Sequence, residues 1–368
     1  MTDNTKSWLT LSLVPRIGQI RMRNLVTRFG SPDKVFEASP QELSAVEGMD
    51  RPAVEAIIGY KTDGAEVERE LELIIRQGAR IVTIQDEDYP FNLKFTFDPP
   101  CLLYVKGTLI PQDNISVAVV GARRATAYGL TAAEKLSGAL AEKMITVVSG
   151  LARGVDTCAH RGALAGGGRT IGVLGSGLGV MYPPENKKLA EEISAHGAVI
   201  SEFSMMTRPE KGNFPRRNRL ISGLTLGTVV VEAAEESGAL ITAGYALEQG
   251  REVFAIPGNI WNKYSRGTHK LIRQGAKLTA GVEDIIEEIE SLREMCLSGQ
   301  KEQINIPEES GLSTEEQHVY DTMSGEPLYI DDISQNSKIN VSLLASVLMG
   351  LEMKGRIKQL SGKRFMKL

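Results

Sequence analysis

The sequence contains few cysteines, and their spacing excludes two kinds of stabilised fold. Cys101, Cys158 and Cys296 are far apart and form no Cys-x-x-Cys pair, so we expect neither a disulfide framework nor a structural zinc site. Long apolar runs are also missing, since none approaches the ~18 residues of a membrane-spanning helix. The polar start MTDNTKSWLT lacks the charged-then-apolar pattern of a secretion signal. These absences predict a cytoplasmic protein with reduced thiols and no membrane span.

Motifs of known catalytic sites are missing as well. The sequence has no GxSxG nucleophile elbow, no GxxxxGKS or GxxxxGKT phosphate loop and no HExxH zinc motif. Glu202 and Glu232 each follow a predicted strand and could form an acid–base pair, but hydrogen bonding near helix starts is the alternative interpretation. We therefore predict no catalytic residue, no metal ligand and no cofactor.

Neither sign of charge dominates the chain. Its 42 Lys and Arg residues stand against 46 Asp and Glu residues, for a net charge of -4. Any binding of a polyanion must therefore come from a local basic patch. The 42% apolar and 24% charged content excludes a disordered, collagen-like or coiled-coil chain. At about 100 to 200 residues per domain, 368 residues predict two to three domains.

Residues 1–75 form the first predicted domain. Apolar residues recur at helical spacing between turn signals, which indicates a small all-helical unit. The stretch LVPRIGQIRMRNLVTRFGS resembles a helix-hairpin-helix or SAM-like unit, in which backbone N–H groups at a helix start can hold a phosphate. A packing and partner-binding module is the alternative.

Residues 76–292 form the second predicted domain, and short apolar strands alternate there with helices. Six strand segments are SVAVVGA, ITVVSG, TIGVLGSG, AVISEF, TVVVEAA and EVFAIPG. Strands that are apolar on both faces are typical of a Rossmann-like, doubly wound parallel α/β sheet covered by helices. The segments IVTIQDEDYP and CLLYVKG predict strands that extend this sheet.

A linker and a third domain complete the predicted organisation. Residues 293–312 are assigned to the linker, because the stretch from about Ser298 to Gly311 is polar and aperiodic. Residues 313–368 predict a winged helix, with a capping box of Ser313 and Glu316, helices near 314–323, 329–334 and 341–354, and a terminal hairpin around Ser361 and Gly362. Basic and acidic residues balance in this domain, so DNA and protein contact are both open.

Two loops at the carboxyl ends of predicted strands suit an anion. Gly121, Ala122 and Arg123 stand between a strand and a helix, where glycine permits close backbone approach and arginine can bind phosphate oxygens. A dinucleotide fits poorly, because the GxGxxG pattern is not satisfied at this turn. Ser149, Gly150 and Arg153 lie at the same sheet edge and would enlarge the surface. Asp156 next to them is interpreted as a helix cap.

The segment RPEKGNFPRRNRLISG is the most basic short stretch of the chain. It combines cations with an aromatic ring, and it follows the strand AVISEF, so it is expected at the same edge of the sheet. Cations that follow phosphates and a ring that stacks on a base suit single-stranded nucleic acid. A solvated charged face and a core phenylalanine are the alternatives. The candidate residues are Lys211, Phe214, Arg216, Asn218 and Arg219.

Taken together, these motifs resemble the DNA-processing protein A (DprA, also called Smf) family. The resemblance is carried by VVGARRATAYG, SGLARGVD, GSGLGVMYPPENKKLA, SEF, NFPRRNRLISGL, VVEAAEESGALITAGYALEQGREVFAIPGN and LIRQGA, in order, between Cys101 and Gly281. It implies a protein without enzymatic activity that binds single-stranded DNA, forms a homodimer and loads the RecA recombinase in natural transformation.

The resemblance also implies site residues. The family's phosphate loop falls on Gly121, Ala122 and Arg123, and its basic residue and stacking ring fall on Lys211 and Phe214. Asn218 and Arg219 belong to the FPxRNR motif. Two departures are Ala122, where the family has Ser or Thr, and His269, where it typically has Asn.

Two competing functions remain open from the sequence. The first is a nucleotide phosphoribohydrolase-like enzyme of the lysine-decarboxylase-like Rossmann group. Those proteins share a PGGxGT loop, whereas this chain has EAAEESGALITA in the corresponding stretch. The second is a transcription factor that uses the winged helix, which a preference of that unit for one duplex sequence would indicate.

Overall fold

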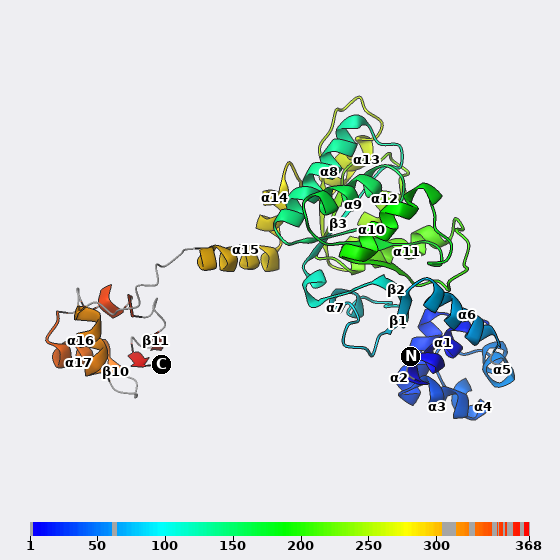
Figure 1. The fold of residues 1–368 in the computed structure, drawn as a ribbon, viewed down its shortest axis with the longest axis horizontal. Helices are drawn as coiled ribbons and strands as arrows, with labels where there is room; N and C mark the ends of the chain where they lie inside the picture. The colour runs from blue at the N-terminus through cyan, green and yellow to red at the C-terminus, as the bar shows by residue number, and fades with distance from the viewer. Residues whose placement is uncertain are drawn as a thin grey trace. The chain divides into compact units, whose positions relative to one another are not determined.

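The chain folds into two compact units, Met1–Ser298 and Gly299–Leu368. The computed structural model describes residues 3–60, 65–303, 314–323, 328–340, 344, 346–348, 350–351, 356–360 and 364–367. Figure 1 traces the elements of each unit. Among the helices of these ranges, none is both long enough and apolar enough to cross a membrane.

The larger unit begins with a group of short helices. These are α1 (Asp3–Leu13), α2 (Gln19–Phe29), α3 (Pro32–Glu37), α4 (Pro40–Ser44), α5 (Arg51–Gly59) and α6 (Ala65–Arg76). Local signals start two of them: Ser39 and Glu42 form a capping box at α4, and the Asp50 carboxylate accepts the Ala53 N–H at α5. Around Trp8, which is fully buried, the helices enclose a shared apolar core.

A nine-stranded sheet forms the centre of the larger unit. Its strands are β1 (Ala79–Thr83), β2 (Leu102–Gly107), β3 (Ser116–Val120), β4 (Thr146–Ser149), β5 (Thr170–Val173), β6 (Ala198–Ser201), β7 (Gly227–Val230), β8 (Glu252–Ala255) and β9 (Lys277–Leu278). Their order in the sheet is β1-β2-β6-β5-β4-β3-β7-β8-β9. Strands β3 to β9 pair parallel with one another, while β2 pairs antiparallel with both β6 and β1. The predicted Rossmann-like sheet and its two extending strands are confirmed.

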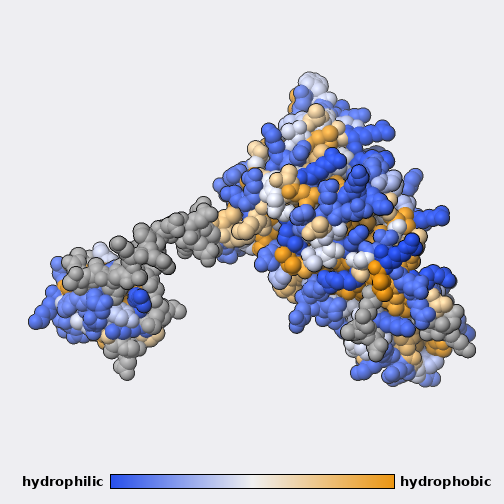
Figure 2. Space-filling model, in the orientation of Figure 1, coloured by the Kyte–Doolittle hydropathy of each residue, from blue (hydrophilic) through white to orange (hydrophobic). Residues whose placement is uncertain are grey.

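Helices cover both faces of this sheet. One apolar cluster joins the sheet to α8 (Ala127–Glu142), α9 (Val155–Ala165) and α14 (Val282–Glu288). The other joins it to α7 (Phe91–Lys94), α11 (Asn213–Gly223), α12 (Gly238–Glu248) and α13 (Arg266–Arg273). Helix α10 (Lys187–His196) packs beside α9. Hydrophilic side chains cover most of the face of this unit seen in Figure 2.

The chain order creates a switch point between β3 and β7. From β3 the chain builds β4, β5 and β6 on one side, and it then returns to place β7, β8 and β9 on the other side. Crossovers that leave neighbouring strands in opposite directions open a crevice at the carboxyl ends of those strands. A ligand is therefore expected beyond Val120 and Val230.

The helical segment and the sheet share one core. Leu102 and Tyr104 of β2, and Cys101 just before it, belong to the same apolar cluster as Trp8 and Leu25 of the helices. The side-chain oxygen of Gln19 accepts the N–H of Cys101 at 2.9 Å. The sequence divides residues 1–75 from 76–292, whereas the structure gathers both into one compact unit.

The smaller unit has the elements of a winged helix. They are α16 (Thr314–Thr322), β10 (Leu328–Tyr329), α17 (Ile330–Ser337), β11 (Ile357–Leu360) and β12 (Arg364–Lys367). Strands β11 and β12 pair antiparallel as the predicted hairpin, and β10 adds a third strand. Val319, Ile333 and Phe365 contribute to its own apolar core.

Some predicted features of the C-terminal part differ or cannot be compared. The sequence assigns residues 293–303 to the linker, whereas in the structure they are helical and form most of α15 (Glu290–Gln303). Residues 304–312, Ser313 of the capping box and the hairpin turn at Ser361 and Gly362 lie outside the described residues. Of the helix predicted for 341–354, the described residues 344, 346–348, 350 and 351 are helical.

Candidate functional site

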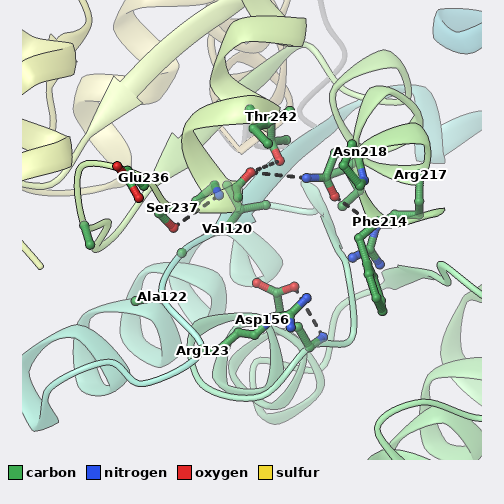
Figure 3. Close-up of a pocket in the computed structure, with 18 of the residues that line it drawn as sticks. Val120, Ala122, Arg123, Asp156, Phe214, Arg217, Asn218, Glu236, Ser237 and Thr242 are labelled. Atoms are coloured by element: carbon green, nitrogen blue, oxygen red, sulfur yellow. Dashed lines mark hydrogen bonds between the residues drawn. The ribbon is translucent and has the colours of Figure 1, made fainter. Parts of the chain in front are cut away.

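A cavity of about 780 Å³ opens at the switch point of the sheet. Its walls come from the loops that follow β3, β4 and β7 and from the beginnings of α11 and α12 (Figure 3). Charged groups of both signs line it: Arg123, Arg124, Lys211 and Arg217 against Asp156 and Glu236. The excess of cations over carboxylates suits an anionic ligand.

The loop after β3 brings Gly121, Ala122 and Arg123 to the cavity. A Cβ on Gly121 would lie 2.7 Å from Cγ2 of Val155 and 3.0 Å from the carbonyl oxygen of Glu232, so only glycine fits there. The N–H of the buried Ala122 donates to the same carbonyl at 2.7 Å. Because the fold already uses this N–H, the exposed guanidinium groups of Arg123 and Arg124 are the cations of this loop that can bind an anion.

The ring of Phe214, at the beginning of α11, contacts Arg123 from the loop after β3. The ring is half-buried, its centroid lies 5.0 Å from Cζ of Arg123 and 5.8 Å from the ring centroid of Tyr182. The ring also packs against Gly175, where a Cβ would lie 2.9 Å from it. Lys211 is exposed and lines the same cavity. A planar ring next to two cations can hold a base while the cations hold its phosphates.

Arg217 forms the buried floor of the site. The residue is 4% exposed, and its guanidinium donates to the carbonyl oxygens of Gly150, at 2.6 Å, and Val173, and to the side-chain oxygen of Asn218 at 3.1 Å. Burial lowers the pKa of Arg217 to about 10, an effect that Asp156 opposes. Burial likewise raises the pKa of Asp156, and Arg217 opposes that shift. Each charge thus partly compensates the burial of the other.

The cavity-facing residues of α11 follow helical spacing. Phe214, Arg217, Asn218 and Ile221 all line the cavity, at positions i, i+3, i+4 and i+7. Arg217 was absent from the residues predicted from sequence, although this spacing counted from Phe214 identifies it. Asn218 was predicted, and its amide donates to the carbonyl oxygen of Gly238 at the start of α12.

The structure corrects two of the predicted site residues. Ser149 is fully buried, and its hydroxyl donates to the carbonyl oxygen of Val119 at 2.6 Å, so it offers no surface to a ligand. Arg219 points to the side of α11 away from the cavity, where it pairs with Glu202 at 2.5 Å and with Asp98 at 3.3 Å. Its charge is therefore used within the fold.

Three further predicted residues do not line the cavity. Gly150 and Arg153 line a small adjoining cleft together with Arg123 and Phe214. Arg153 is paired there with Glu185. Arg216 is exposed, and its guanidinium lies over the ring of Phe203 at 5.2 Å.

The two glutamates considered as an acid–base pair have separate structural partners. Glu232 accepts the backbone N–H and the hydroxyl of Thr126 at 2.8 and 2.7 Å, at the start of α8. Glu202 is buried against Arg219, and this burial raises the pKa of its carboxyl group. The hydrogen-bonding interpretation is confirmed for Glu232.

The structure also shows which groups Asp156 and His269 contact. Asp156 does not cap α9, whose N-cap is Gly154; it accepts the N–H of Ala152 at 3.3 Å instead. His269 keeps a polar contact at its turn, since its Nε2 lies 3.0 Å from the carbonyl oxygen of Gly258. Within the ranges that the structure describes, no group of three or more His, Cys, Asp or Glu residues could hold a metal ion.

These features define a Rossmann-like protein with a cationic, aromatic switch-point cavity and a winged-helix unit. Residues 80–290 match the family model of DNA recombination-mediator protein A, and residues 306–363 match that of the DprA winged helix domain. The chain belongs to this DprA/Smf family, as the sequence motifs predicted.

Relatives support the assignment along most of the chain. It is 44% identical over 276 residues to the DNA processing protein DprA of Bacillus subtilis, covering 74% of this chain and 93% of the relative. It is also 32% identical over 388 residues to Protein Smf of Synechocystis, covering 97% of each.

Two solved structures share the fold. DNA processing protein A of Streptococcus pneumoniae matches with a TM-score of 0.69 at 37% identity, over 79% of this chain and 99% of that one. DNA processing protein A of Helicobacter pylori matches with a TM-score of 0.52 at 28% identity, over 60% and 97%. The latter structure concerns a single-stranded DNA binding mode.

Proposed function

We propose that this chain binds single-stranded DNA in the switch-point cavity and acts in DNA processing in the cytoplasm. The observation that carries the proposal is the half-buried Phe214 ring beside Arg123, with Lys211 on the same cavity. A base in a duplex has no free face for such a ring, whereas an unpaired base does. The single-stranded DNA binding mode of the Helicobacter pylori relative supports the same ligand.

The test compares ligands side by side. Labelled single-stranded DNA, blunt duplex of the same sequence and free nucleotides are titrated into the purified full chain. We expect the single strand to bind most tightly and with little dependence on sequence, because the cavity offers stacking and charge and no reading of base edges in a major groove. Equal or tighter binding of the duplex would overturn the proposal.

The finer role that we propose is protection of incoming DNA and loading of the RecA recombinase during transformation. Membership of the DprA/Smf family supports this role. The test is whether the chain speeds RecA filament formation on single strands coated with single-strand-binding protein. No acceleration, with single-strand binding intact, would reject the recombinase partner.

We further propose that the chain acts as a homodimer. Leu247 on α12 is 61% exposed and Leu278 on the edge strand β9 is 54% exposed, and both elements pack on β8. Two linked sites raise the effective concentration of the second site for the same strand. Light scattering of the Leu247→Asp and Leu278→Asp variants tests this, and we expect both variants to be monomers. In a binding assay they should still bind short oligonucleotides but should release long ones faster than the wild type does.

No enzymatic step is included in this proposal. The alternative, a nucleotide phosphoribohydrolase-like enzyme, requires a carboxylate that can act on a nucleotide in the cavity. Glu232 is held by Thr126 and Asp156 faces Arg217, which favours binding over hydrolysis. Release of a free base from nucleoside monophosphates by the wild-type chain, lost on Glu236→Gln, would establish the alternative.

A further inference from the structure

An exposed tryptophan stands on the loop between β8 and α13. Trp261 is 86% exposed and its neighbour Ile260 is 69% exposed. The loop leaves the carboxyl end of β8, which is next to β7 in the sheet, so it rises at the edge that holds the switch-point cavity. Tyr264, from the same loop, lines that cavity.

Hydrogen bonds connect this loop to the wall of the cavity. The N–H of Trp261 donates to the side-chain oxygen of Asn259 at 2.8 Å. Asn262 donates to Glu232, the residue that holds the start of α8, at 3.3 Å. The carbonyl oxygen of Tyr264 accepts the N–H of Ala233 at 2.7 Å. The tryptophan is therefore presented by an ordered turn next to the cavity.

The surroundings of Trp261 combine rings and cations. Lys263 is exposed, and its ammonium group lies 5.1 Å from the ring centroid of Tyr264. The exposed Tyr128 donates its hydroxyl to the carbonyl oxygen of Pro257, at the beginning of the loop. Arg266 follows and is also exposed. Glu236 lines the same cavity as Tyr264, and its carboxylate repels phosphates, which favours a base rather than a phosphate beside it.

We propose that Trp261 is a second base-stacking platform, which binds the part of a single strand that leaves the cavity. This inference rests on the proposed function, because it assumes that Phe214 and the cations bind the first part of the strand. The ring-and-cation environment continues from the cavity through Tyr264 and Lys263 to Trp261. Unpaired bases stack on exposed indole rings without regard to sequence, and the lysine can follow the backbone.

The two tryptophans of the chain provide a direct readout. Trp8 is fully buried in the helical segment, so its fluorescence should stay constant when DNA binds. A long oligothymidylate should quench the fluorescence of the wild-type chain through Trp261. Thymidine monophosphate should quench it little, because one nucleotide occupies only the cavity. The Trp261→Phe variant should show no quenching with either probe.

Affinity provides the second readout. Trp261→Ala should weaken binding of the long oligothymidylate about fivefold or more, the loss expected for one stacked base. Trp261→Phe should retain part of that affinity, since a ring remains. Binding of thymidine monophosphate should be unchanged in both variants. Ile260→Ala is the matched control: it removes an exposed apolar side chain from the same loop without removing a ring, and it should leave affinity unchanged.

The outcomes separate this inference from the proposed function. If Phe214→Ala weakens binding while Trp261→Ala neither alters affinity nor removes quenching, the second platform is rejected and the cavity proposal stands. If Trp261→Ala turns dimers into monomers in light scattering, the tryptophan contacts a second copy of the chain and the platform is likewise rejected. If the wild-type chain binds no single-stranded DNA, both proposals fail.

Discussion

At the scale of single residues, charge and stacking are divided between different side chains of one cavity. Arg123 and Lys211 carry charge, while Phe214 carries an uncharged ring. Salt weakens binding only through the counterions that cationic contacts release, at a slope of about -0.7 in log affinity per phosphate neutralised on a single strand. The two kinds of contact therefore respond differently to salt.

We predict that Arg123→Ala and Lys211→Ala each weaken single-strand binding and flatten its dependence on salt. Phe214→Ala should weaken binding with the slope nearly unchanged, since stacking releases no counterions. Titrations at several salt concentrations measure both quantities. A large fall in melting temperature of the Phe214→Ala variant would instead identify the ring as a core residue.

The buried His160 gives stability a dependence on pH. Burial is the main cause and the charge of nearby Arg217 the second, and together they lower the pKa of this imidazole from 6.5 to about 3. Its Nδ1 lies 2.7 Å from the hydroxyl of Thr170. Below about pH 6.5 the imidazole binds a proton in the unfolded chain but not in the folded chain. The free energy of unfolding therefore decreases as pH falls.

We predict that the urea midpoint declines progressively from about pH 6.5 toward pH 3, the window set by the two pKa values of His160. The variant His160→Gln cannot take up this proton, so its midpoint should decline less steeply over the same window. The comparison uses the slope and not the absolute stability, which the substitution also changes. Parallel slopes in the two proteins would show that other groups determine the acid sensitivity.

At the scale of the element, two sides of helix α11 have different surroundings. One side lines the cavity through Phe214, Arg217 and Asn218, and the other carries Arg219, which pairs with Glu202 and Asp98. The helix thus connects the cavity to a buried ion pair. Removing one partner of such a pair leaves an uncompensated buried charge, whereas replacing both by apolar groups is often nearly neutral.

We predict that Arg219→Met destabilises the fold by about 3 kcal/mol or more, and that adding Glu202→Leu restores much of the loss. Urea unfolding of the single and double variants measures this coupling. The double variant should still bind single-stranded DNA like the wild type, because Arg219 does not face the cavity. A loss of DNA affinity in the double variant, with stability restored, would return Arg219 to the DNA site.

Sequence patterns predicted elements better than the directions of side chains. The apolar runs identified the strands from β3 to β8, and their both-faces-buried character identified a parallel sheet covered by helices. The motif around Phe214 pointed to α11, which lines the cavity. It could not identify the rotation of that helix, which depends on packing against the sheet, and so Arg219 was included and Arg217 was not. Ser149 was also predicted wrongly as a site residue. The side chain of a strand's last residue can point either to the ligand edge or into the fold, and the sequence does not distinguish the two.

At the scale of the whole molecule, the candidate site belongs to one unit. Every residue that lines the cavity lies between Val120 and Tyr264, inside the unit Met1–Ser298. The winged-helix unit has its own apolar core around Val319 and Phe365. A separate core indicates that the larger unit can fold without it.

We predict that a chain truncated after Glu309 retains single-strand affinity close to that of the full chain. Fluorescence anisotropy with the same labelled oligonucleotide compares the two proteins, and a circular dichroism melt of the truncated chain confirms that it is folded. A loss of most of the affinity in a folded truncated chain would assign part of the DNA surface to residues 310–368.

The core shared by the first helices and the sheet has a consequence for recombination between genes. Leu102 and Tyr104 are buried by the same cluster as Trp8 and Leu25, and Glu70 of α6 accepts the N–H of Met205 at 2.6 Å. A crossover near residue 75 could replace the preceding helices with an unrelated module. This exchange would expose one edge of the sheet to solvent and leave the N–H of Met205 without its acceptor. In this chain, exchange of the helical segment should therefore destabilise the sheet, whereas exchange of the winged helix, with its own core, should leave the sheet folded.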